Sequence, residues 1–329
     1  MIAQPPALRR ALNAARRPAS PAPPAGTETG QRQRPHIANA MTIDVEDYFQ
    51  VEAFAATIER TEWERLPPRV DRNTERLLDI LAAAEVQATF FMLAWVAQRH
   101  PALVRRIVTE GHELASHGCD HVRVDRQSPE SFRADVRRSK QILEDAGGAE
   151  VVGYRAPTFS IGSRSTWAHA VLAEEGYRYS SSVYPVRHDL YGSLGAPRTA
   201  FAPLRGMIEI PLTSVRILGV DLAASGGGWF RLYPYPLSRW LLARAVRCNR
   251  APAIFYLHPW EIDPHQPREH RAPWRSRFRH YLNLARTEAR LERLLRNFAW
   301  TRMDRLFLTD TSGPFPVIAT WTDHRSRSR

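Results

Sequence analysis

The sequence predicts an α/β fold built on a parallel sheet, and three observations lead to that prediction. The chain has 329 residues, of which 43% are hydrophobic, so it is long enough to bury a full core. From residue 37 onward, short apolar runs alternate with amphipathic stretches in the order strand, helix, strand. No repeat of fixed period is present, which argues against a solenoid. Alternation of this kind is typical of βαβ units.

The first half of the chain follows this alternation closely. We expect strands at residues 40–45, 86–93 and 113–115 and helices at 73–85, 101–110 and 129–146. In the first helix, Leu77 and Leu81 lie on one face, as the helical period requires. The second helix begins at Pro101 and stops at Gly111, and Ser128 is a strong start signal for the third.

The second half continues the pattern with longer connections. We expect strands at residues 151–152, 177–181, 207–210 and 254–257 and helices at 166–175 and 237–247. The glycine-rich stretch 225–230 lacks the lysine and the Ser or Thr of a phosphate-binding loop. It predicts a flexible loop that walls a cleft, with Trp229 and Phe230 available to stack on a sugar.

Residues 1–38 form a separate segment rich in proline, alanine and arginine and without aromatic residues. Such a composition cannot bury enough apolar surface to offset its ordering entropy, so we expect a disordered N-terminal extension. An arm for a membrane surface or nucleic acid, a transit-like leader, or a start codon assigned too far upstream are the alternatives. We favour an inert extension.

The charge and hydropathy of the chain limit the classes of protein to which it could belong. The formal net charge is +12, and Lys140 is the only lysine among many arginines, which indicates a coding bias of the genome. No basic face with interleaved aromatic residues is visible, so nucleic acid is not an expected partner. No apolar run approaches the ~18 residues of a membrane span, and the N-terminus lacks the apolar core of a secretory signal. We therefore expect a cytoplasmic protein.

Two histidines four positions apart are the strongest chemical signal. His117 and His121 would turn to the same side of a helical turn or tight loop, which suits two ligands of one metal ion. A catalytic metal usually takes three protein ligands and keeps one position open. Cys119, between the histidines, is expected to be a small buried filler rather than a ligand, and with Cys248 it forms no disulfide framework.

Three carboxylates follow the first predicted strand within four residues: Asp44, Glu46 and Asp47. Packing this much negative charge together is costly unless a cation or a proton relieves it. A metal held by one carboxylate and two histidines would do so and leave a second carboxylate to act as a base. The alternative is a solvated acidic loop that caps the next element.

Two further polar residues follow later strands. Arg155 precedes a proline turn, where its guanidinium would pair with a carboxylate, although a surface position is the alternative in so arginine-rich a chain. His258 leaves an apolar strand beside Trp260, a position suited to proton donation to a leaving group, and a structural histidine is the alternative. All these residues follow strand ends, and in an α/β barrel that edge carries the active site.

Together the motifs resemble the polysaccharide deacetylase family, the NodB-like, metal-dependent carbohydrate esterases that include the chitooligosaccharide deacetylases of nodulation. The resemblance covers residues 39–265 and runs in family order from Asp44 through His117, His121 and Arg155 to His258. The stretches 44–49, 153–157 and 257–261 further resemble a subgroup associated with exosortase/PEP-CTERM exopolysaccharide clusters. That subgroup has its own part from about residue 206, and residues 266–329 would form a C-terminal helical extension with a basic tail.

The resemblance implies a distorted (β/α) barrel and a divalent metal, usually zinc, bound by one carboxylate and two histidines. Asp44 matches the base that activates water, His117 and His121 match metal ligands, Arg155 matches the residue that orients the base, and His258 matches the acid. The third ligand departs from the pattern.

Most relatives have adjacent aspartates, but Val45 follows Asp44, so the third ligand is Glu46 or Asp47, with a slight preference for Asp47. A second departure is the run Ser180-Ser181-Ser182, where relatives often have an aspartate before the serines.

The implied activity is hydrolysis of N-acetyl groups on amino sugars of a polysaccharide or its precursor, in exopolysaccharide synthesis. Pro157, Trp229 and Trp260 are expected to contact the sugar. The basic ends of the chain suggest association with synthesis machinery at the inner membrane. The alternatives are an amidase acting on a cyclic imide or purine breakdown product with the same scaffold, a non-catalytic sugar-binding protein, and a nucleic-acid-binding protein.

Overall fold

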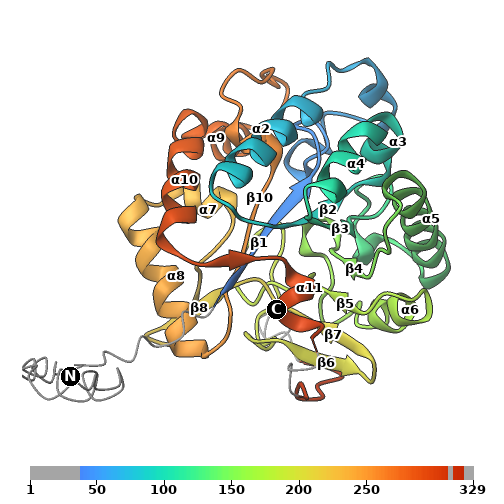
Figure 1. The fold of residues 1–329 in the computed structure, drawn as a ribbon, viewed down its shortest axis with the longest axis vertical. Coiled ribbons are helices and arrows are strands. Elements are labelled where there is room, and N and C mark those ends of the chain that lie inside the picture. The colour runs from blue at the N-terminus through green and yellow to red at the C-terminus, as the bar shows by residue number, and fades with distance from the viewer. Residues whose placement is uncertain (1–37, 310–313, 322–329) are drawn as a thin grey trace, which may run out of the picture. The chain divides into compact units, whose positions relative to one another are not determined.

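A curved, mostly parallel sheet surrounded by helices forms the centre of the molecule (Figure 1). The computed structural model describes residues 38–309 and 314–321. The predicted disordered extension, apart from its last residue, and the basic tail with Arg325, Arg327 and Arg329 lie outside the described residues. The architecture is mixed α/β, with a sheet that curves like a barrel without closing, as the predicted fold class requires.

Nine strands of the described residues share the central sheet, in the order β10-β1-β2-β3-β4-β5-β7-β6, with β11 pairing with β1. Their bounds are β1 (Asn39–Val45), β2 (Thr89–Met92), β3 (Glu113–Ser116), β4 (Gly153–Tyr154), β5 (Tyr179–Ser180), β6 (Phe201–Leu204), β7 (Met207–Glu209), β10 (Ile254–Leu257) and β11 (Trp300–Thr301). All pairs are parallel except β6 with β7. A separate antiparallel hairpin consists of β8 (Ser214–Ile217) and β9 (Val220–Ala223).

The α-helices lie around this sheet (Figure 1). Their bounds are α2 (Val70–Ala83), α3 (Ala94–Arg99), α4 (Pro101–Thr109), α5 (Pro129–Gly147), α6 (Ala168–Glu174), α7 (Gly227–Leu232), α8 (Tyr235–Asn249), α9 (Trp274–Tyr281), α10 (Thr287–Asn297) and α11 (Met303–Phe307). The predicted end signals act as expected in α5, where the Ser128 hydroxyl accepts the Ser131 amide and Gly148 closes the helix at φ 64°.

Three predictions of local structure need correction. The strand expected at residues 151–152 is instead β4, two residues later, where Tyr154 pairs with Ser116 of β3 and Ser180 of β5. The glycine-rich stretch expected to be a flexible loop contains α7, because the glycines allow its backbone to pack closely against neighbouring side chains. The C-terminal extension is not purely helical, since β11 adds a strand beside β1.

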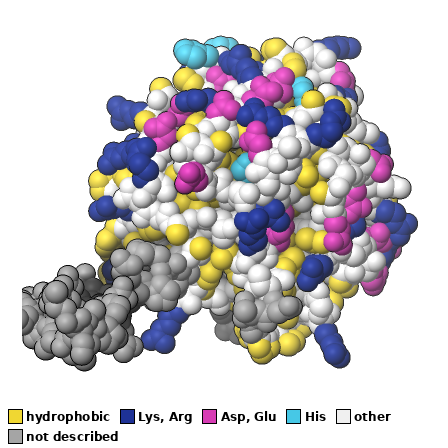
Figure 2. All heavy atoms as spheres, viewed as in Figure 1, with side chains coloured by type: hydrophobic (Ala, Val, Ile, Leu, Met, Phe, Trp, Pro, Cys, Tyr) yellow, Lys and Arg dark blue, Asp and Glu magenta, His cyan; other side chains and the backbone are white. Residues whose placement is uncertain are grey.

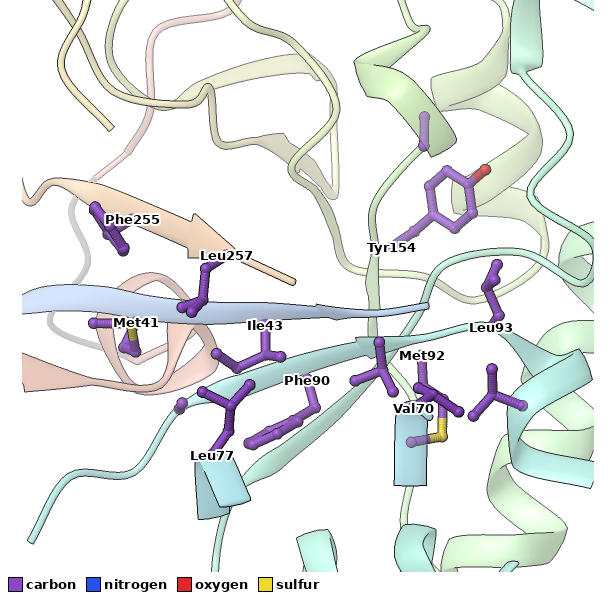
Figure 3. Packing of buried hydrophobic residues seen from close by; sticks show 14 of the residues in the cluster. Met41, Ile43, Val70, Leu77, Phe90, Met92, Leu93, Tyr154, Phe255 and Leu257 are labelled. Atoms are coloured by element: carbon purple, nitrogen blue, oxygen red, sulfur yellow. The ribbon is translucent and has the colours of Figure 1, made fainter. Parts of the chain in front are cut away.

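The hydrophobic core lies between the sheet and its helices. Figure 3 shows Ile43, Phe90, Leu257 and Leu77 meeting there, from β1, β2, β10 and α2. All seven residues of β1 are buried, including the polar Asn39, Thr42 and Asp44, so both faces of this strand are covered. The core thereby fixes the strand ends on which the polar residues sit.

The outer surface carries charges of both signs. Figure 2 shows arginine and acidic side chains interspersed on the face in view, without one continuous basic patch. None of the helices in the described part of the chain combines the length and the apolarity that crossing a bilayer requires.

Candidate metal centre and active site

The carboxyl ends of four parallel strands bring the predicted polar residues to one edge of the sheet. Asp44 lies at the end of β1, His117 follows β3, Arg155 follows β4 and His258 follows β10. A pocket of about 390 Å³ opens at this edge, and Asp44, His117 and His258 line it. Residues that are up to 214 positions apart in the chain therefore meet in one cavity because parallel strands end on the same side.

Glu46, His117 and His121 form a cluster that could hold a metal ion. One ligand atom from each lies within 4.8 Å of the others, and the two imidazole centroids are 5.3 Å apart. His121 adopts a left-handed backbone conformation, φ 55°, which is uncommon for a residue with a side chain. The preceding Gly118, at φ 79°, belongs to the same tight loop. The histidine pair therefore sits on a turn, one of the two settings that its spacing allows.

The chemistry of these three side chains fits a divalent cation. The Nδ1 atom of His117 lies 2.7 Å from the carbonyl oxygen of Arg155, so Nδ1 carries the proton and Nε2 keeps its lone pair. Burial lowers the pKa of His117 to about 4, which keeps the ring neutral. Glu46 Oε2 is buried without a hydrogen bond and lies 2.8 Å from His121 Nε2. An orphaned carboxylate oxygen beside imidazole nitrogens is what a metal ion would satisfy.

The surroundings of Glu46 keep its carboxylate ionised and oriented toward His117 and His121. Burial alone would raise the pKa of Glu46, but the imidazoles of His121 and His258 outweigh burial and lower the pKa to about 2. The other oxygen, Oε1, lies 3.4 Å from the indole nitrogen of Trp260, which donates to it. Glu46 is therefore ionised, buried and oriented, as a metal ligand must be.

Asp47, the slightly preferred third ligand, lies outside this cluster and points elsewhere. Its Oδ2 accepts the backbone amides of Arg69 (2.7 Å) and Val70 (3.0 Å), and its Oδ1 accepts that of Tyr48 (2.8 Å). Arg69 and Val70 begin α2, so Asp47 caps that helix from a distant part of the chain. The preference for Asp47 is thus corrected in favour of Glu46, because the helix start has already taken the Asp47 carboxylate.

Asp44 is fixed by the buried guanidinium of Arg155. Arg155 Nη1 donates to Asp44 Oδ1 at 2.6 Å and to the Thr42 hydroxyl at 2.7 Å. Its Nε and Nη2 donate to the backbone and side chain of Ser181, and its guanidinium lies 4.0 Å from the ring centroid of Phe91. Arg155 has no exposed surface, so the surface alternative does not apply. Asp44 keeps its Oδ2 directed toward the pocket side, 3.9 Å from His258 Nε2.

His258 lies opposite, with its Nε2 3.5 Å from Glu46 Oε1. Burial alone would lower the pKa of His258, but the carboxylates of Glu46 and Glu261 outweigh burial and raise the pKa to about 9. The surrounding carboxylates therefore favour the protonated ring. An imidazole that lines the pocket in this setting is suited to donate a proton.

The three predicted sugar contacts differ in what they offer. Trp229 lines the pocket, and its indole nitrogen donates to the Tyr191 hydroxyl at 3.1 Å. Trp260 is only 6% exposed and stacks on His258 and His280, so it has little surface left for a sugar. Pro157 is buried, and the residues after it line the pocket in its place.

Sequence reasoning missed several residues of this site. Thr158 and Phe159 line the pocket and adopt left-handed backbone conformations, which no sequence pattern signalled. Arg231 and Glu261 form a buried ion pair, at 2.9 Å, beside His258. Glu261 lies three residues after His258, within the motif 257–261. This spacing was a signal that the two side chains could meet across a turn. Arg231, 30 positions away from Glu261, gave no signal.

Comparisons with known proteins agree with this geometry. Residues 63–180 match the family described as "Polysaccharide deacetylase", and residues 181–308 match "Domain of unknown function (DUF3473)". A peptidoglycan-N-acetylglucosamine deacetylase of Bacillus cereus is 35% identical over 71 residues, or 22% of this chain and 33% of that protein. A chitooligosaccharide deacetylase of Rhizobium leguminosarum bv. trifolii is 34% identical over 73 residues, 22% of this chain and 34% of that protein. The chain thus spans about one third of these curated relatives.

Two solved structures share the fold. A putative polysaccharide deacetylase from Mycobacterium smegmatis superposes with a TM-score of 0.58 at 20% identity, covering 92% of this chain and 99% of that one. The allantoinase Puue superposes with a TM-score of 0.53 at 16% identity, covering 83% and 91%. The sheet, the clustered residues at its edge and the matches lead to one conclusion: residues 63–180 of this chain match the polysaccharide deacetylase family, and the chain shares the fold of the Mycobacterium smegmatis protein.

Proposed function

We propose that this protein is a metal-dependent hydrolase that removes N-acetyl groups from amino sugars of a polysaccharide or its precursor. Glu46, His117 and His121 would hold the metal, and zinc suits a site of two imidazoles and one carboxylate. When bound, the cation would polarise the amide carbonyl and make water more acidic. The proposal draws support from the deacetylase relatives and from the way these ligands adjoin an acid and a base.

The chain's own residues supply the proton transfers. Asp44 takes a proton from the attacking water, while Arg155 holds the carboxylate in place through Oδ1 and leaves Oδ2 for that proton. His258 gives a proton from Nε2 to the amide nitrogen as the C–N bond breaks and its electron pair moves to nitrogen. The products are acetic acid and the free amine, and transfer of the proton on Asp44 to His258 restores both residues, so atoms and charges balance. Asp44 and His258 act within one pocket because their reactive atoms are 3.9 Å apart.

The observation that carries this proposal is the meeting of a candidate metal-ligand cluster, an oriented carboxylate and an imidazole held between carboxylates in one cavity. The test is acetate release from an N-acetylglucosamine oligomer, measured together with metal content. We expect the wild-type protein to release acetate and His117→Ala to lose both metal and activity. Full activity in a His117→Ala protein free of metal would contradict the proposal.

A second candidate is an amidase that opens a cyclic substrate. The specific observation in its favour is the fold shared with an allantoinase, at a TM-score of 0.53. The same acid, base and ligand cluster would serve a ring amide, because the bond that breaks is also C–N. Ring opening of allantoin without acetate release from the oligomer would favour this candidate over deacetylation.

The setting of the reaction is part of the proposal. We place it in exopolysaccharide synthesis at the inner membrane, on the basis of the motif at residues 257–261 and the arginine-rich sequence ends. We expect the exopolysaccharide of a strain that lacks this protein to contain no deacetylated amino sugars. An unchanged polymer would contradict this assignment.

A further inference from the structure

The imidazole of His258 is held by a carboxylate three residues further along. Glu261 Oε2 accepts the backbone amide of His258 at 3.0 Å and lies 3.1 Å from its Nδ1. Both contacts form across a short 3-10 turn, Pro259–Ile262, so chain geometry sets the distance between the two side chains. With Nδ1 donating to Glu261, the opposite nitrogen, Nε2, is the one directed toward Asp44 and Glu46.

Glu261 is itself anchored by a buried arginine. Arg231 Nε donates to Glu261 Oε1 at 2.9 Å, and the two side chains are 2% and 1% exposed. Arg231 Nη1 donates to three backbone carbonyls, those of residues 279, 280 and 282, at 2.8–3.1 Å. A guanidinium fixed at so many points has little freedom to move, so it holds the carboxylate in a single position.

Space for this carboxylate depends on one glycine. A Cβ atom at Gly227, the first residue of α7, would overlap the carboxylate of Glu261. The next residue, Gly228, differs, because a Cβ atom there would meet no atom within 4 Å. Neither glycine has a positive φ, so alanine fits the backbone at both positions and only the contact with Glu261 separates them.

We propose that Glu261, anchored by Arg231 and accommodated by Gly227, is the residue that positions His258 for proton delivery to the leaving group. This inference rests on the proposed hydrolase function. Glu261 touches neither substrate nor metal in this role; it acts through the ring that it holds. The run of serines at residues 180–182 is engaged elsewhere, with Ser181 bound to Arg155 and Ser182 to the backbone amide of Ala156.

A positioning role predicts a dependence on the leaving group. An amide nitrogen must gain a proton as the C–N bond breaks, so misplacing His258 slows amide hydrolysis. The nitrophenolate of 4-nitrophenyl acetate leaves without a proton, so hydrolysis of that ester needs the water and the base but not the acid. A purely structural role for Glu261 would affect both substrates alike, since it would act on the whole pocket.

The experiment compares Glu261→Gln and Gly227→Ala with Gly228→Ala as the matched control. For Glu261→Gln and Gly227→Ala we expect kcat on the N-acetylglucosamine oligomer to fall about 10–100-fold, the range for residues that orient reacting groups. We expect kcat on 4-nitrophenyl acetate, KM for the oligomer and metal content to stay near wild-type values. Gly228→Ala, which adds a methyl group on the pocket wall without touching Glu261, should keep the wild-type ratio of the two kcat values.

Three outcomes would overturn the inference. They are equal losses on both substrates, an unchanged kcat on the oligomer, and loss of metal from the Glu261→Gln protein. The retained ester activity doubles as a folding check for Gly227→Ala. If the wild-type protein releases acetate and Glu261→Gln does so equally fast, the positioning role alone fails. If the wild-type protein releases no acetate, the proposed function fails instead.

Discussion

Separate substitutions of the neighbouring carboxylates Glu46 and Asp47 distinguish metal binding from helix capping. Glu46 lies in the ligand cluster, whereas Asp47 accepts the backbone amides of Arg69 and Val70 at the start of α2 and that of its neighbour Tyr48. Glu46→Gln should therefore lose the metal with little change in stability. Asp47→Ala should keep the metal and lose stability. The two residues are adjacent in sequence, so the pair forms its own matched control.

The size of the stability loss follows from the contacts of Asp47. Hydrogen bonds to a charged group contribute about 1.5–3 kcal/mol each, so three of them would amount to roughly 4.5–9 kcal/mol. Burial opposes this gain strongly, because even with these hydrogen bonds the pKa of Asp47 is raised to about 6 from 3.8. Water can also reach the half-buried Arg69 amide in the variant. We therefore expect Asp47→Ala to lower the free energy of unfolding by about 2–4 kcal/mol.

The assay is urea unfolding followed by circular dichroism, with the metal content of each purified protein measured by mass spectrometry. The unfolding experiments are done on metal-free protein, so that lost binding energy does not enter the comparison. The reasoning would be refuted if the Asp47→Ala protein failed to bind metal but was as stable as the wild type, and if the Glu46→Gln protein still bound metal. This pair of results would identify Asp47 as the third ligand.

Three further predictions concern other parts of the molecule. Burial lowers the pKa of His112 to about 4, whereas the unfolded chain titrates near 6.5, so the unfolded state takes up the proton first as pH falls and stability is lost below pH 6.5. His112 should account for about 2 kcal/mol of the stability lost between pH 7 and pH 5, and His112→Asn, which keeps an acceptor for the Ala88 amide, should reduce the loss by that amount; an unchanged pH slope in urea unfolding would contradict it. Arg155→Lys keeps the charge but loses the guanidinium group, whose separate nitrogens donate to Asp44 and Ser181, so kcat should fall about 10–100-fold with the metal retained. Wild-type turnover of this variant would show that the guanidinium contacts are dispensable. Trp229→Ala should raise KM for the oligomer about 3–10-fold at constant kcat, as expected for a lost stacking surface, and an unchanged KM would exclude that contact.

The fold class could be predicted from the sequence because buried segments can be recognised by their apolar residues. The larger apolar residues of β1, Met41, Ile43 and Val45, are all buried, and α5 carries both of its end signals. The position of β4 was wrong because apolarity reports burial, while a strand is defined by the partners that its backbone finds. Those partners, Ser116 and Ser180, come from distant segments.

The site was predictable as a set of residues but not as a set of contacts. The order of motifs identified Asp44, His117, Arg155 and His258, and the parallel sheet explains why they meet. Which of two neighbouring carboxylates faces the histidines depends on where α2 begins, and no local pattern contains that information.

The contacts around His258 were hidden for a related reason. The helix α7 contradicts the low helix propensity of its glycines, and it forms because Gly227 leaves room for Glu261. Arg231 reaches Glu261 only through the tertiary fold. Local sequence preference and function conflict at this point, as they often do beside a functional site.

The central claim is that Glu46, His117 and His121 hold one catalytic metal ion. It is tested most directly by stripping the purified protein with a chelator, adding back zinc in steps, and measuring bound metal and acetate release from the N-acetylglucosamine oligomer in the same samples. The account predicts that activity is absent at the start and rises in proportion to bound metal until one ion per chain is reached, with no rise in His117→Ala. Acetate release by the stripped protein, or activity that does not follow the bound metal, would contradict it.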